Sequence, residues 1–479
     1  MTTQETARPR IGLPTKLLYA SGAVASSVKQ RGLSTFLLIF YNQVMGLPPA
    51  TVGLVIMLTL FWDAVCDPTV GQVSDNFKSP WGRRHPFMYA SAVPVALLFF
   101  MIWNPPALSE QMMAVYLLGC LLLIRLFDTF YELPALALAP ELVSDYDKRT
   151  QLYSLRMLFN VVGGLGMTVL AYQVFLKENA DGTGGVLDRA GYLPYSITGA
   201  ILIFAAIIIS TVGTHRQIPY LARPPAKTPG LKDMLKEAGL TMRSRSFLAV
   251  VLTGVFISVA GGAKQGLDLY WLIYFFEFTQ AQIATITIVG VGAAVMGTAI
   301  APVWVKWFGK KFGAISSFTI ALGVGVTPLL FRLMEILPAN GTQELFWFFM
   351  AEILISTSFS TATLIMISAM IADVVEEAEL RTGRRSEGLL LSADNLFKKA
   401  VSGVGVFVSS MLLAAVGFPE GAERGQVDQT ILTNLALIYL PTAATLFFMA
   451  ILCMFLFKID RATHEETLRK LKAAATPAE

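Results

Sequence analysis

Carboxylates inside apolar segments are the residues of this sequence with the clearest chemistry. Asp63 and Asp67 lie four residues apart in an apolar stretch, so a helix places them on one face. Two carboxylates that share a site do not both stay ionised cheaply, so one takes a proton or a cation lies between them. Asp128 and Glu132 repeat the same spacing. The pattern predicts a site for H⁺ or Na⁺ at Asp63 and Asp67, which Asp128 and Glu132 could face across the first bundle.

Basic residues in other apolar stretches indicate contacts with a solute. Lys29 and Arg31 are two residues apart, hence about 200° apart around a helix, so one is expected to fix helix packing while the other meets a ligand. Lys264 and Asp268 are four apart and could instead pair with each other. The predicted solute-binding set is Lys29, Arg31, Asp128, Arg156, Lys264, Asp268, Asn395 and Lys399.

A structural reading of the same charges stays open. The acids could serve only to neutralise Arg125, Arg156 or Lys29 in ion pairs. A charge at the centre of a bilayer costs at least about 2.5–3.5 kcal/mol, so an ionisable residue there is a functional candidate by default.

The elements that carry these residues are membrane helices. The chain has 479 residues, of which 54% are hydrophobic and 15% charged, whereas a soluble protein has roughly 25% charged residues. Its apolar runs approach or reach the length of about 20 residues that crosses a bilayer as a helix. The composition excludes a soluble enzyme, a disordered chain and a collagen-like chain. It predicts an all-α, polytopic membrane protein.

Hydropathy, turn residues and loop charges predict twelve transmembrane helices. An even number places both termini on one side, and the basic loops assign that side to the cytoplasm. We expect a multi-pass protein of a plasma membrane, the bacterial inner membrane. The predicted spans are 14–45, 50–74, 87–105, 111–140, 153–176, 194–214, 247–277, 281–306, 313–334, 343–373, 387–417 and 430–458.

The chain divides into two related halves. Residues 1–214 form a predicted six-helix bundle, 215–246 a proline-rich basic cytoplasmic linker, 247–458 a second bundle and 459–479 a cytoplasmic tail. A surface helix is expected within 231–240. Lys29-Gln30-Arg31-Gly32-Leu33 recurs as Lys264-Gln265-Gly266-Leu267, and Gly82-Arg83-Arg84 corresponds to Gly309-Lys310-Lys311. Parallel six-helix repeats are one architecture of membrane transporters, with a binding site near the midplane.

Several chemistries lack their usual residues. The three cysteines lie in apolar runs and predict no disulfide framework, and the three histidines lie in or beside basic loops. No Walker A sequence is present, which argues against ATP-driven transport. We expect no cofactor, no metal beyond a possible Na⁺ at Asp63 and Asp67, no nucleic-acid partner, and a monomer.

Two stretches resemble a known family. Gly71-Gln72-Val73-Ser74-Asp75 with Gly82-Arg83-Arg84 resembles the loop 2–3 signature of the major facilitator superfamily. The longer run from Trp62 to Pro68, with Trp81 to Phe87, is similar to the glycoside–pentoside–hexuronide:cation symporters, whose best-known member is the melibiose carrier. The resemblance covers most of the chain at low identity, and the Asp-x-x-x-Asp-Pro motif carries it best.

The resemblance implies roles for individual residues. Asp63 and Asp67 match cation-binding carboxylates, and Glu132 occupies the place of an aspartate that serves both cation and sugar. Arg156 falls at or next to a sugar-binding arginine, and Lys399 matches a lysine near both sites. Three departures weaken the implied sugar site: Ser27 replaces a sugar-binding aspartate, and Leu136 and Leu364 replace two sugar-stacking tryptophans.

Residues and resemblance together predict a secondary active transporter. It would couple H⁺ or Na⁺ to the symport of a sugar, glycoside or related, possibly anionic, organic solute by alternating access. One alternative is a cation-coupled carrier of an amphipathic, lipid-like solute. A second, from another class, is an intramembrane prenyl transferase that holds Mg²⁺-diphosphate on aspartates such as Asp63, Asp67 and Asp75.

Overall fold

The computed structural model describes residues 11–143, 145–179, 184–221, 245–382 and 387–457, together with Arg469. Within these ranges the chain is helical, and its one β-bridge joins Glu178 to Gly184. The expected surface helix at 231–240 and the tail beyond 457, except Arg469, lie outside the described residues.

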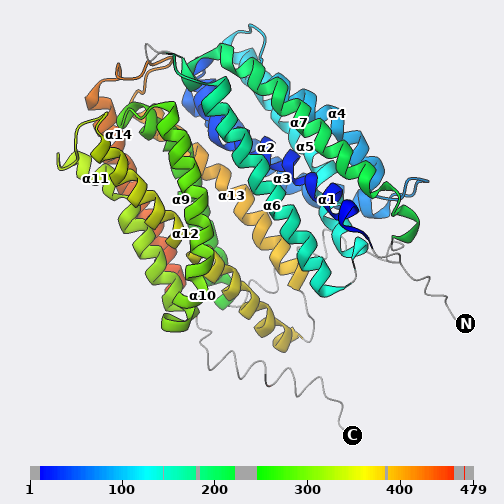
Figure 1. Cartoon of the computed structure of the whole chain (residues 1–479). Coiled ribbons are helices and arrows are strands. Elements are labelled where there is room, and N and C mark those ends of the chain that lie inside the picture. Colours follow the sequence, from blue (N-terminus) through cyan, green and yellow to red (C-terminus); the bar gives the residue numbers. More distant parts are fainter. Residues whose placement is uncertain are drawn as a thin grey trace, which may run out of the picture. The chain divides into compact units, whose positions relative to one another are not determined.

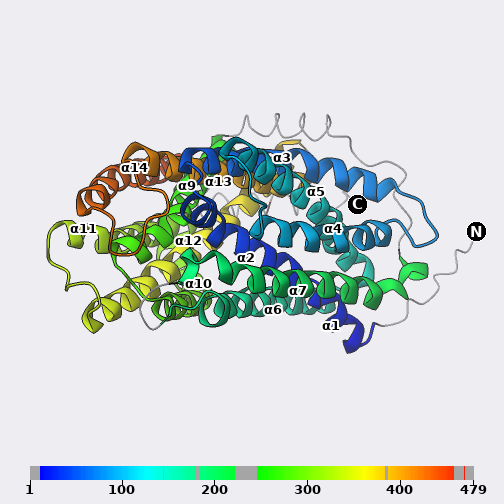
Figure 2. The same ribbon diagram turned by 90° about the horizontal axis from the view of Figure 1, so that it is seen from above.

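Contacts group the chain into two compact units (Figures 1 and 2). Unit 1 comprises residues 1–47 and 61–230, and unit 2 comprises 48–60 and 231–479. Residues 48–60, the beginning of α3, therefore group with the second unit, where an ideal Cβ on Gly53 would meet the Ser410 side chain of α13. The bounds predicted for the bundles and the linker stay a prediction.

Unit 1 contains the first half of the helices. In it α4 packs against both α5 and α7, and α2 packs against α6 and α7 (Figure 1). The elements are α1 (Leu13–Ser21), α2 (Ala23–Ile39), η1 (Phe40–Val44), most of α3 (Pro49–Asn76), α4 (His85–Trp103), α5 (Glu110–Leu142), α6 (Tyr146–Leu170), η2 (Ala171–Phe175), η3 (Gly185–Leu187), α7 (Arg189–His215) and η4 (Ile218–Tyr220).

Unit 2 contains the second half. Its closest helix pairs are α10 with α12 and α9 with α13, and α14 packs on α9. The elements are α9 (Arg245–Tyr270), η5 (Trp271–Phe275), α10 (Gln280–Gly325), α11 (Thr327–Leu333), α12 (Gln343–Thr382), α13 (Glu387–Ala415) and α14 (Gln429–Phe455).

Local chemistry explains where the helices begin. Proline lies in the first turn of α1, α4 and α11, where its missing N–H costs nothing. Asp188 and Asp428 accept hydrogen bonds from the first backbone N–H groups of α7 and α14. Thr279 and Gln282 form a reciprocal capping box at the start of α10.

Nine helical segments among the described residues are long and apolar enough to cross a membrane. The segments predicted at 281–306 and 313–334 form one continuous run, Gln280–Leu333. Gly309 has non-helical dihedral angles inside α10, φ 70° and ψ 174°, so two helical segments meet there at a kink. A residue with a side chain would be strained at this φ, which explains why glycine occupies the turn.

One type of helix terminus occurs in both units. The π-helical turns η1 and η5 end the first helices of the two halves, and each is followed by a residue with positive φ, Gly46 (72°) and Glu277 (54°). After these residues, the N–H of Leu47 donates to the Tyr41 carbonyl and that of Phe278 to the Leu272 carbonyl. The same helix terminus is therefore built twice, 231 residues apart.

Candidate functional site

The predicted acids of α3 meet two side chains of α5 in unit 1. Arg125 donates from Nη1 to Asp63 Oδ2 at 2.9 Å, and Thr129 donates from Oγ1 to Asp67 Oδ1 at 2.9 Å. Both pairs are four residues apart on their helices, so two contacts one turn apart join the same faces of α3 and α5. The Asp63 side chain is 2% exposed and that of Arg125 is 9% exposed. Asp63 therefore carries its own counter-ion, as the structural reading of the sequence anticipated.

A second ion pair joins α2 to α5. The Lys29 ammonium contacts the Asp128 carboxylate, and the Lys29 side chain is 4% exposed. Arg31 is exposed, so the two bases point to different environments, as their separation around the helix predicts. Glu132, one turn after Asp128, is half-buried. Lys29 and Asp128 thus join α2 to α5 in unit 1.

Arg156, the base implied by the resemblance, lies in α6. It is 7% exposed, and its guanidinium lies over the Tyr19 ring, 5.6 Å from the centroid. Its Nη1 is buried without a hydrogen-bond partner among the described residues. An unpaired donor on a buried cation is costly, so this nitrogen is a candidate contact for an anionic or hydroxyl-bearing solute.

In unit 2, Lys264 and Asp268 follow one face of α9. Lys264 is exposed and Asp268 half-buried, and the two interact electrostatically. Glu352 of α12 takes part in the same cluster although it is only 7% exposed. Lys399 is half-buried in α13, whereas the side chain of Asn395 lies outside the described residues.

The loop between α3 and α4, which carries the signature of the major facilitator superfamily, forms an ion-pair cluster that connects α3, α4 and α5. Arg83 contacts Glu141, and Arg84 lies 2.8 Å from Glu141 and 3.3 Å from Asp75. Burial lowers the pKa of Arg84, and the neighbouring Glu141 opposes that shift. The cluster fixes the loop between α3 and α4.

The second half repeats this arrangement. Lys310 donates to both carboxylate oxygens of Asp373 in α12, at 2.5 and 2.8 Å. Gly82 and Gly309 precede the basic residues, with φ values of 74° and 70°. Each half therefore has a glycine with positive φ, followed by a basic residue that forms an ion pair with an acid on another helix.

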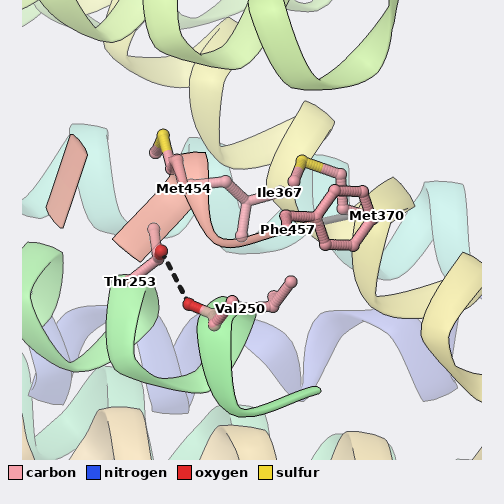
Figure 3. Close-up of a pocket in the computed structure, with 7 residues that line it drawn as sticks. Val250, Thr253, Ile367, Met370, Met454 and Phe457 are labelled. Carbon is pink, nitrogen blue, oxygen red and sulfur yellow. Dashed lines mark hydrogen bonds between the residues drawn. The ribbon is translucent and has the colours of Figure 1, made fainter. Parts of the chain in front are cut away.

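A small pocket in unit 2 is unsuited to a polar solute (Figure 3). Its wall comes from α9, α12, α14 and Phe457, two residues beyond α14, and it lies in an apolar core cluster. The one polar side chain in the wall, Thr253, already donates to the Ala249 carbonyl at 2.8 Å. The lining residues are Ala249, Val250, Thr253, Ile367, Met370, Met454 and Phe457.

Two residues of these clusters escaped the sequence analysis. Glu352 lies in an apolar run of the predicted span 343–373, so the criterion that selected Asp63 applies to it equally. Thr129 has no charge, and its only signal was the spacing of four from Arg125, which matches the spacing of Asp63 and Asp67.

Apolar helices of membrane length with ionisable side chains paired between them define a multi-pass membrane protein of the transporter class. Residues 18–461 match the family described as MFS/sugar transport protein. An uncharacterised symporter of Synechocystis is 26% identical over 98% of both chains. The sodium-dependent lysophosphatidylcholine symporter 1-A of Danio rerio is 25% identical over 95% of this chain and 88% of its own.

A solved structure has the same fold. The crystal structure of a bacterial homologue of the human lysosomal transporter Spinster superposes with a TM-score of 0.59 at 14% identity, over 99% of this chain and 100% of that one. The chain belongs to the MFS/sugar transport protein family, within the major facilitator superfamily. It is therefore a membrane transporter and not an enzyme, which excludes the prenyl transferase alternative.

Proposed function

We propose that this chain is a secondary active transporter that couples H⁺ or Na⁺ to the symport of a sugar, glycoside or related, possibly anionic, organic solute by alternating access. The observation that carries the proposal is the pair of contacts between α3 and α5, which gathers Asp63 and Asp67 beside Arg125 and Thr129 inside membrane-length helices. The family description and the relatives named symporters support coupling to a cation.

The proposed cation site comprises Asp63, Asp67 and Glu132. Arg125 already neutralises Asp63, so the cation would lie mainly at Asp67, where the Thr129 hydroxyl adds an oxygen. Glu132 lies three residues beyond Thr129 on α5, which is the same helix face. Carboxylate and hydroxyl oxygens suit Na⁺, and either carboxylate alone suits H⁺.

Solute contacts are proposed for each unit separately. The charged or polar side chains are Lys29, Arg31, Asp128 and Arg156 in unit 1, and Lys264, Asp268, Asn395 and Lys399 in unit 2. Among them, Arg156 offers the unpaired Nη1 donor, and Lys29 would release Asp128 to meet a solute.

An amphipathic, lipid-like solute is a second candidate. Leu136 and Leu364 stand where the resemblance places sugar-stacking tryptophans, and their exposed fractions are 39% and 51%. Accessible aliphatic side chains favour an acyl chain over a sugar ring, and one relative is named as a lysophosphatidylcholine symporter.

We also propose the topology of two six-helix repeats in a bacterial inner membrane, acting as a monomer with both termini cytoplasmic. The nine apolar segments support twelve spans when the run Gln280–Leu333 is divided at Gly309 and when the Leu13–Val44 run and α13 are added. The helix terminus and the glycine–base–acid arrangement that recur in both units support the repeat.

Thermal unfolding of the purified protein tests the cation site without knowledge of the solute. If Na⁺ is the ion, replacing N-methylglucamine by Na⁺ at constant ionic strength should raise the melting temperature. If H⁺ is the ion, a lower pH should raise it. In both cases a ligand that binds only the native state stabilises that state. Asp67→Asn should abolish the shift. Glu110→Gln, an exposed acid in the first turn of α5, should retain it.

The same samples identify the solute. A screen of sugars, uronides and lysolipids should reveal a compound whose stabilisation depends on the ion, followed by gradient-driven uptake into proteoliposomes. A cation response that persists unchanged in Asp67→Asn contradicts the proposed site.

A further inference from the structure

A buried carboxylate in unit 2 has no role in the site proposed above. Glu352 lies in the apolar part of α12 and is 7% exposed. Its electrostatic partners are Lys264 and Asp268 of α9. Among the described residues, neither acid lies within 4 Å of the Lys264 ammonium in an ion pair.

The charges of this cluster do not balance. In the described part of unit 2, one ammonium faces two carboxylates, so the cluster carries an excess negative charge if all three groups are ionised. Asp268 is the nearer counter-ion, since it lies one turn from Lys264 on the same helix and dominates the electrostatic interactions of that lysine. Glu352 is left as the more buried acid with the weaker compensation. A net charge within a membrane-spanning helix is costly and is removed most cheaply by a proton.

The surroundings supply an acceptor for such a proton. The Ser356 hydroxyl, one turn further along α12, lies beside the Glu352 carboxyl, and it is 4% exposed. It makes no hydrogen bond of good geometry in the described part of the chain. A carboxyl O–H at Glu352 can donate to this oxygen, which satisfies two buried polar groups together, and an ionised Glu352 can accept from the same hydroxyl, so Ser356 accommodates both protonation states.

Among the residues that the structure describes, the other helices of unit 2 bring no further counter-ion to Glu352. The end of α10 at Gly325 approaches it closely, but the charged residues of α10 lie at least fourteen residues earlier, and Arg332 of α11 donates to Pro338 and Asn340. The charged or titratable groups on the surrounding helices are Lys264 and Asp268 of α9, Lys306, Lys310 and Lys311 of α10, Arg332 of α11, Lys398 and Lys399 of α13, and Tyr439 of α14, which interacts with Asp268.

We propose that Glu352, with Lys264, Asp268 and Ser356, forms a proton-binding site in unit 2, in which the Glu352 carboxyl holds H⁺ at neutral pH and donates it to Ser356 Oγ. The neighbouring ammonium disfavours Na⁺ at this position, so the ligand is a proton. This site is independent of the cation proposed at Asp67, because it is built from different residues in a different unit.

Infrared spectroscopy of the purified protein, with neither solute nor Na⁺, tests the proposal directly. We expect a carboxylic acid C=O band at neutral pH that disappears in Glu352→Gln and persists in Glu344→Gln, an exposed acid in the first turn of the same helix. If Glu352→Gln does not fold, Glu352→Asp serves, because a shortened acid should shift the band. A band unchanged by substitution of Glu352, or one that Na⁺ abolishes, overturns the proposal.

The pH dependence of unfolding provides a second readout. A group that holds a proton when folded and loses it when unfolded makes stability fall as pH rises, by up to about tenfold in the unfolding equilibrium constant per pH unit. Glu352→Gln should remove this component above the ordinary pKa of glutamate, and Asp67→Asn should leave it intact. Equal slopes in wild type and Glu352→Gln contradict the proposed proton site whatever the outcome at Asp67.

Discussion

The ion pair between Asp63 and Arg125 provides the sharpest test of how unit 1 is built. Its atoms are 2.9 Å apart, and the side chains are 2% and 9% exposed. Removal of one partner from a buried pair leaves an uncompensated charge and costs about 3–5 kcal/mol. Asp63→Asn and Arg125→Gln should each destabilise the protein by this amount. The double variant lacks both charges of the pair and should recover most of the loss.

The buried cysteines make this measurement practical. Cys66, Cys120 and Cys453 are free and buried, so a thiol-reactive dye reports on unfolding as the temperature rises. Thr129→Val is the matched control, because it removes a neutral hydrogen bond to Asp67 in the next turn and should cost only about 1 kcal/mol.

The double variant also separates structure from coupling. If the cation lies at Asp67, Asp63→Asn/Arg125→Gln should retain a stabilising response to the ion, which Asp67→Asn lacks. Additive losses in the double variant would refute the argument, because they would show that the two charges do not compensate each other.

Three further predictions concern local structure. Glu277 has φ 54°, a backbone conformation that strains any residue with a side chain. Glu277→Gly and Glu277→Ala both lose the carboxylate, but only glycine relieves this strain, so the glycine variant should be more stable by about 1 kcal/mol. Equal melting temperatures would contradict this. A Cβ on Gly262 would lie 2.3 Å from a backbone oxygen of α13, so Gly262→Ala should lower the free energy of unfolding by about 1–3 kcal/mol. A Cβ on Gly261 meets no atom within 4 Å, so Gly261→Ala should leave the melting temperature nearly unchanged. The hydrogen bond from the Thr430 N–H lowers the pKa of Asp428 below its ordinary value, so the stability from this helix cap is present above the ordinary pKa and is lost as pH falls through the lowered one. Asp428→Asn should therefore weaken the dependence of the melting temperature on pH in acid. An unchanged dependence would contradict the contribution of the cap.

Much of the architecture could be predicted from local sequence. Runs of apolar residues predicted membrane helices because every backbone group in a bilayer must be satisfied within the segment. The spacing of Asp63 and Asp67 predicted a shared helix face, and the Asp-x-x-x-Asp-Pro motif indicated the family that the comparison of residues 18–461 shows. These signals lie within windows of a few to about twenty residues, so no knowledge of packing was needed.

The choice of partners depended on tertiary structure. The sequence left Arg125, Arg156 and Lys29 as equal candidates to neutralise the acids, and the structure pairs Arg125 with Asp63 and Lys29 with Asp128. That choice depends on the rotation and the vertical offset of each helix against its neighbour, which no single window encodes. The same holds for Glu352, whose importance comes from its burial beside α9. The sequence by itself determined that charges lie within membrane helices, and only the packing decided which of them compensate one another.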